Sequence, residues 1–104
     1  MDIKLRKIGL DGLYVTASGR LDLDNAVEFG SRIKNYIEDS EDVITDVTLD
    51  LAEIAFISSF GLKVILELYK QLKAQNGTLK LKNVSEQLMA SFKLVGFDKF
   101  LLFE

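Results

Sequence analysis

The chain has 104 residues, of which 48% are hydrophobic, and its 16 acidic and 13 basic side chains give a net charge of −3. This length and composition predict one globular domain, residues 1–104, with a core of its own. The small negative charge provides no basic surface for nucleic acid or for an anionic membrane. The sequence contains no cysteine and no histidine, which excludes disulfides, thiol chemistry, a Ser-His-Asp triad and most transition-metal sites.

The N-terminal segment Met1–Arg6 lacks the apolar stretch that a signal peptide requires. The longest internal stretch without a charge, Ile54–Leu62, is far too short to cross a membrane. We therefore expect a cytoplasmic protein without membrane insertion.

The first part of the chain changes its hydrophobic period. Apolar residues in Ile3–Leu5 and Leu13–Ala17 predict two strands, and the glycines of Gly9–Gly12 between them predict a hairpin turn. Residues 25–39 have helical spacing, and Asn25 followed by Glu28 predicts a capping box at the start of a helix. The apolar stripe of this helix consists of Ala26, Phe29, Ile33, Tyr36 and Ile37.

A strand, a helix and a second strand follow. Alternating apolar residues predict a strand from about Ile44 to Leu51. Helical spacing then predicts a helix over Ser59–Gln75, and we expect Gly77 to adopt the left-handed conformation that ends it. The alternation resumes in the next strand, around Leu79–Leu81. The apolar face of the helix consists of Leu62, Ile65, Leu66, Tyr69 and Leu72.

The last part of the chain completes an alternating order of strands and helices. Ser85 predicts the cap of a third helix that stops at Gly96, and Phe100–Phe103 predicts a short final strand. Strand–helix–strand units form right-handed crossovers between parallel strands. Lys80 and Lys82 leave one face of their strand polar. The predicted fold is therefore α/β, a mixed sheet made of an N-terminal hairpin and parallel strands, with helices mainly on one face.

Two aspartates, Asp22 and Asp24, flank Leu23 ahead of the first helix. A metal site would need more oxygen ligands than this loop offers, whereas carboxylates at a helix start are stabilised by the helix dipole. The chain also has no Gly-x-Gly-x-x-Gly and no Walker motif. We predict no metal, no cofactor and no catalytic residue, so a small enzyme or nucleotide-binding domain is the least supported class.

The two serines Ser58 and Ser59 separate a buried strand from a helix. A serine in this position is most simply an N-cap, which contributes about 1 kcal/mol. One cap needs one serine, however, and the other lies at the edge where α/β sheets place their sites. A phosphate there would meet the helix dipole, a gain of at most about 2 kcal/mol, too little to refold the domain. It would strongly oppose binding to an uncharged protein surface.

Several segments together resemble the STAS domain family, the bacterial anti-sigma factor antagonists. The resemblance covers essentially the whole chain, in order. The segments that carry it are Gly19–Asp22, Val47–Leu51, Phe56–Leu62, Leu66–Lys70, Asn76–Leu81 and Leu94–Phe100.

The resemblance also implies site residues. The family motif is an aspartate, a phosphorylatable serine, a small residue and a glycine, and Ser59 matches the phosphoacceptor while Gly61 matches the glycine. Ser58 stands where the family has the aspartate and remains the alternative acceptor, and Phe60 stands where it has the small residue. Asp22 matches an aspartate near the family's partner-binding surface. The implied partner-binding residues are Asp22, Ser58, Phe60 and Gly61.

The implied function is that of a switch protein that catalyses nothing. Such a domain binds an anti-sigma factor that is also a serine kinase and so releases the sigma factor; phosphorylation breaks the complex, and a phosphatase restores it. The alternative is a STAS module that is not phosphorylated and that binds a lipid-transport ATPase or a stress-signalling scaffold. The serine at position 58 in place of the family aspartate is the reason for this alternative. The sequence does not indicate an oligomeric state.

Overall fold

A computed structural model describes residues 1–104 and contains a five-stranded sheet in the order β1-β2-β3-β4-β5. Strands β1 and β2 are antiparallel, and all other neighbouring strands are parallel. The strands are β1 (Asp2–Ile8), β2 (Gly12–Leu21), β3 (Asp46–Ile57), β4 (Thr78–Lys82) and β5 (Leu102–Phe103). The helices are α1 (Leu23–Asp39), α2 (Ser59–Ala74), α3 (Glu86–Leu94) and the short 3-10 helix η1 (Phe97–Lys99). The predicted α/β class with a mixed sheet is confirmed.

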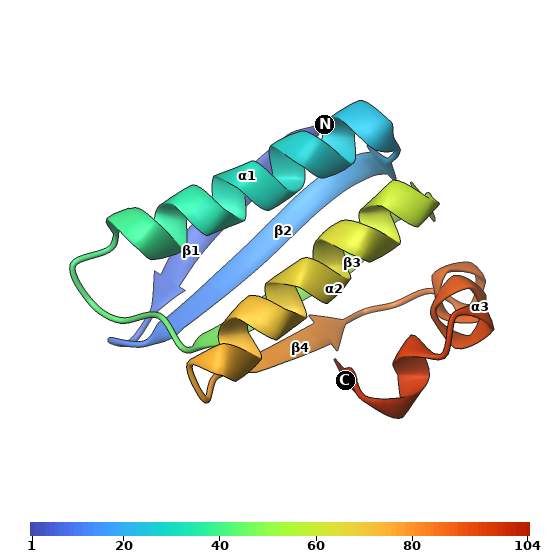
Figure 1. Ribbon diagram of the computed structural model, residues 1–104. Coiled ribbons are helices and arrows are strands. Elements are labelled where there is room, and N and C mark those ends of the chain that lie inside the picture. Colours follow the sequence, from blue (N-terminus) through green and yellow to red (C-terminus); the bar gives the residue numbers. More distant parts are fainter.

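Helices α1 and α2 lie side by side across one face of the sheet (Figure 1). Along β2, Leu13, Val15 and Ala17 are buried beneath the helices, whereas the alternate residues Tyr14 and Thr16 are only half-buried. This alternation is what a sheet covered on one face produces. The expectation that the helices lie mainly on one face is therefore confirmed.

Strands β2 and β3 extend beyond the predicted segments. They pair in parallel to their last residues, with Arg20 opposite Phe56 and Leu21 opposite Ile57. Register irregularities interrupt this pairing, and one of them follows Gly19, whose φ is 116°. The extra residue lies in β3, because the consecutive residues Gly19 and Arg20 pair with Ile54 and Phe56. The break in the apolar pattern at Gly19 therefore lies opposite a bulge, which disturbs the pairing without ending β2.

The start of α1 corrects one prediction. Asp22 is the N-cap, and its Oδ1 accepts a hydrogen bond from the Asn25 N–H at 3.2 Å. The predicted capping box at Asn25 and Glu28 is wrong, because Asn25 lies within the first turn. The Asn25 side chain instead donates to the Arg20 carbonyl oxygen at 2.9 Å, which ties the helix start to the end of β2.

The end of α2 and the last strand also differ from expectation. Asn76, not Gly77, is left-handed, with a φ of 60°. Gly77 is required for another reason, since a Cβ atom there would lie 2.2 Å from the Thr45 carbonyl oxygen. Strand β5 begins only at Leu102, because the N–H groups of Phe100 and Leu101 bond back to the Phe97 carbonyl oxygen at 3.3 and 3.0 Å.

Candidate functional site

Ser58 joins the end of β3 to the start of α2. As the N-cap of α2, its Oγ accepts a hydrogen bond from the Gly61 N–H at 3.2 Å. The same hydroxyl donates to the Leu21 carbonyl oxygen at 2.8 Å, and the Ser58 N–H reaches that oxygen at 2.9 Å. The hydroxyl is thus used as both donor and acceptor, which makes Ser58 the capping serine of the pair.

Ser59, the first residue of α2, is exposed, and its hydroxyl makes no hydrogen bond within the protein. It lies at the N-terminus of a 16-residue helix, which carries about half a unit of positive charge. Lys63 follows one turn later and is also exposed, at the spacing that brings two side chains of a helix together. The free hydroxyl at this position is the feature that a modifying enzyme can reach.

Gly61 allows α2 to start close to the sheet. The residue is buried, and a Cβ atom there would lie 2.7 Å from Ile57 Cγ1 and 2.9 Å from the Leu21 carbonyl oxygen. Both distances are shorter than a Cβ atom tolerates, so any side chain would displace the first turn of the helix. Gly61 therefore shapes the surface around Ser59 and is not itself exposed on it.

The starts of α1 and α2 both expose apolar side chains. Phe60 and Leu23 are each 49% exposed, and Val27, one turn after Leu23 on α1, is 58% exposed. The predicted partner residue Phe60 thus presents much of its ring to solvent, whereas Asp22 is half-buried and is occupied in capping α1. The starts of α1 and α2 thus expose apolar side chains together with the charged side chains of Asp24, Glu28 and Lys63.

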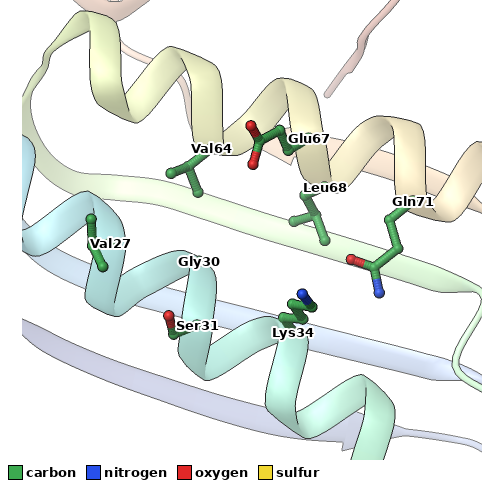
Figure 2. Close-up of a pocket in the computed structure, with 8 residues that line it drawn as sticks. All are labelled: Val27, Gly30, Ser31, Lys34, Val64, Glu67, Leu68 and Gln71. Carbon is green, nitrogen blue, oxygen red and sulfur yellow. The ribbon is translucent and has the colours of Figure 1, made fainter.

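A groove of about 390 Å³ runs between α1 and α2 (Figure 2). The helices approach closely, since a Cβ atom at Gly30 would lie 2.8 Å from Val64 Cγ1. The lining residues are Val27, Gly30, Ser31 and Lys34 from α1 and Val64, Glu67, Leu68 and Gln71 from α2. Val27 and Val64 lie one turn beyond Leu23 and Phe60, so the groove begins one helical turn from the exposed apolar side chains at the two helix starts.

Arg20 is a residue near the site that the sequence pattern did not single out. Its guanidinium carbon lies 4.4 Å from the centre of the Phe56 ring, a cation–π contact across the ends of β2 and β3. Arg20 precedes Leu21, whose carbonyl oxygen receives both bonds from Ser58. Arg20 is the only cation in the segment Gly19–Asp22, and this was the one sequence feature that could have drawn attention to it. The aromatic ring that it contacts, Phe56, lies 36 positions further along the chain, so the sequence alone does not show the contact.

The groups with shifted pKa values lie on the open face of the sheet, away from Ser59. Burial raises the pKa of Asp50, but hydrogen bonds from Tyr14, Asn83 and the Ala52 N–H outweigh it, and the pKa is lowered. The Tyr14 hydroxyl donates to Asp50 Oδ2 at 2.6 Å and the Asn83 amide to Oδ1 at 3.0 Å. The same bond to Asp50 is the main reason that the pKa of Tyr14 is raised. This network joins three segments of the sheet.

The acidic residues do not assemble into a metal site. No group of three or more His, Cys, Asp or Glu side chains is arranged to hold an ion. Asp22 caps α1 and Asp24 lies in its first turn, where the helix dipole stabilises a carboxylate. No helix has both the length and the apolar character needed to span a membrane.

Comparison with known proteins places these features in a family. Residues 3–104 match the STAS domain. The anti-sigma-B factor antagonist of Bacillus subtilis is 29% identical over 84 residues, which cover 81% of this chain and 73% of that protein.

Solved structures share the fold. SpoIIAA, an anti-sigma factor antagonist, superposes in its unphosphorylated form with a TM-score of 0.79 at 17% identity, covering 99% of this chain and 87% of that chain. A Thermotoga maritima protein superposes with a TM-score of 0.86 at 19% identity, covering 97% and 84%. The predicted resemblance is confirmed: the chain belongs to the STAS domain family.

Proposed function

We propose that the protein is an anti-sigma factor antagonist whose binding to an anti-sigma factor is controlled by phosphorylation of Ser59. The observation that carries the proposal is that the two serine hydroxyls differ in their hydrogen bonds and exposure. Ser58 uses its hydroxyl to cap α2 and to hold Leu21, whereas the Ser59 hydroxyl is exposed and unbonded. Similarity to the anti-sigma-B factor antagonist of Bacillus subtilis supports the antagonist function, and SpoIIAA, another anti-sigma factor antagonist, shares the fold.

A phosphate on Ser59 would change the surface rather than the fold. It adds nearly two negative charges beside Lys63 and the helix N-terminus, which together stabilise it by about 1–2 kcal/mol. The neighbouring side chain of Phe60 is apolar and half exposed. A partner that covers this surface would have to desolvate the phosphate, which costs several kcal/mol unless the partner supplies a cation. Phosphorylation therefore releases the partner without unfolding the domain.

This scheme requires two other proteins: an anti-sigma factor that is also a serine kinase, and a phosphatase that removes the phosphate. The protein itself serves as substrate and ligand and catalyses no step.

Phosphate mapping tests the assignment of Ser59. The protein is incubated with the anti-sigma factor kinase of the same organism and ATP, and the product is mapped by mass spectrometry. We expect one phosphate on Ser59, no phosphate on the Ser59→Ala variant, and continued modification of Ser58→Ala. Phosphate on Ser58, or none on either serine, would contradict the proposal.

Binding measurements test the consequence of phosphorylation. Ser59→Asp should bind the anti-sigma factor at least about tenfold more weakly than the unmodified protein, and Ser59→Ala should bind normally. Thermal unfolding of both variants serves as the control for folding. Equal affinities of the two variants would refute charge as the cause of release.

The alternative function is a STAS module that binds a lipid-transport ATPase or a stress-signalling scaffold without phosphorylation. The specific observation in its favour is that Ser58 occupies the position of the family aspartate. Recovery of a transporter ATPase with the tagged protein, combined with no phosphate on Ser59, would favour this alternative.

A further inference from the structure

The end of the molecule opposite Ser59 also exposes large apolar side chains. Leu10, in the turn between β1 and β2, is 75% exposed; Val43, in the loop between α1 and β3, is 71% exposed; and Ile8, at the end of β1, is 48% exposed. Figure 1 shows this turn and this loop at the same end of the sheet, away from the start of α2. We call Ile8, Leu10 and Val43 the hairpin-end surface.

Direct contacts hold the two segments of the hairpin-end surface together. The Asp11 carbonyl oxygen accepts hydrogen bonds from the N–H groups of Thr45 and Asp46, at 2.9 and 3.1 Å. Lys7, next to Ile8, forms an ion pair with Asp42, next to Val43. The three apolar side chains are therefore presented by a fixed backbone, which reduces the entropy lost when a partner binds.

The surroundings of this surface are acidic. Asp11, Asp39 and Glu41 form no ion pair, and the last turn of α1 contains no basic residue. The C-terminus of a helix adds about half a unit of negative charge, so an acidic last turn costs stability. Two cations near this end have no ion-pair partner: Lys73 in the last turn of α2, and Arg6 of β1, which is exposed and stacks on the Tyr14 ring. Excess negative charge thus surrounds an apolar centre.

We propose that the hairpin-end surface is a second docking site, for a protein segment that carries apolar side chains flanked by lysine or arginine. An apolar centre with a charged rim is the usual composition of a protein interface, and opposite charge on the partner favours its encounter. An anionic lipid surface would be repelled by the acidic rim. Two copies of this chain would meet like charges if they joined through this surface. This site is independent of the proposed function at Ser59.

A peptide titration tests the second site. A synthetic amphipathic peptide of leucine and lysine is titrated into the 15N-labelled full chain, and the amide shifts are followed by NMR. We expect shifts in Ile8–Asp11 and Asp42–Ile44 that weaken with added salt. A leucine and glutamate peptide of the same pattern should not bind. Shifts centred on Phe60, or equal binding of both peptides, would overturn the proposal.

Variants of the apolar centre complete the test. The double variant Leu10→Ser/Val43→Ser should bind the basic peptide at least about tenfold more weakly, with an unchanged circular dichroism spectrum. Leu94→Ser is the matched control, because Leu94 is 87% exposed on α3, outside the hairpin-end surface. Unchanged affinity of the double variant would overturn the proposal. So would binding to anionic vesicles, or self-association in sedimentation, that the double variant abolishes.

Discussion

Replacing each serine of the pair by alanine distinguishes the capping serine, Ser58, from the proposed phosphoacceptor, Ser59. Ser58→Ala removes the acceptor of the Gly61 N–H, which costs about 1 kcal/mol for an N-cap. It also removes the hydroxyl bond to the Leu21 carbonyl oxygen. That oxygen keeps its bond from the Ser58 N–H, so this second loss is about 0.5 kcal/mol and not the cost of an unpaired group. Ser59→Ala removes an exposed, unbonded hydroxyl and should change stability by no more than about 0.5 kcal/mol.

Urea and thermal unfolding of both variants measure this difference. For a domain of this size, Ser58→Ala should lower Tm by about 6–12 °C, and Ser59→Ala should leave it nearly unchanged. Ser85→Ala is the matched control: Ser85 caps α3 by accepting the Leu88 N–H at 3.2 Å, but it donates no hydrogen bond. It should cost less than Ser58→Ala. If Ser59→Ala were as destabilising as Ser58→Ala, the assignment of the cap to Ser58 would be refuted.

Two further variants test the packing of the site and the open face. Gly61→Ala should destabilise by about 1–2 kcal/mol in urea unfolding, because crowding against Leu21 exceeds the gain in helix propensity; a more stable variant would contradict the close approach. The lowered pKa of Asp50 contributes stability that is complete above the unfolded value of about 3.9 and is lost as pH falls through the folded value. Asp50→Asn should therefore lose less stability than the parent between about pH 5 and about pH 3, and parallel curves would contradict this. Conversely, the raised pKa of Tyr14 contributes stability below about pH 10 that is lost at higher pH.

The helices and their burial were predictable because hydrophobic spacing dominates them. Helix α2 begins at Ser59 as predicted and ends one residue before the predicted Gln75. Polar capping and turn residues mark both ends. Of the predicted apolar face, Ile65 and Leu72 are buried and Leu62, Leu66 and Tyr69 are half-buried, whereas the buried Leu68 was not predicted. Short-range patterns of this kind depend on the chain's own period and caps.

The errors arose where a distant segment decided the outcome. Asp22 and Asn25 were both acceptable caps for α1 by residue type, and the choice between them depends on the end of β2, where Asn25 bonds to the Arg20 carbonyl oxygen. Gly77 is a glycine because Thr45, from another loop, lies against it. A single sequence contains the residue types but not these contacts.

The candidate site divides in the same way. The serine pair and Gly61 were visible as a strand end followed by a helix start. The sequence could not show which of the two serines is the cap, because the distinction depends on a contact with Leu21 at the end of the neighbouring strand. The Leu21 carbonyl oxygen accepts a hydrogen bond from the Ser58 hydroxyl. The groove between α1 and α2 could not be predicted from the sequence, since Val27 and Val64 come from helices that meet only in the folded chain.

The distance between the two proposed surfaces determines whether they influence one another. Strand β2 runs from the hairpin end to the Ser59 end, and its ten residues span about 30 Å at about 3.3 Å per residue. Charges at this separation are screened in a physiological buffer, where the Debye length is about 8 Å. A phosphate on Ser59 also leaves the start of α2 unchanged, because Ser58 and not Ser59 caps this helix. Phosphorylation should therefore release the partner at one end while a cationic segment remains bound at the other.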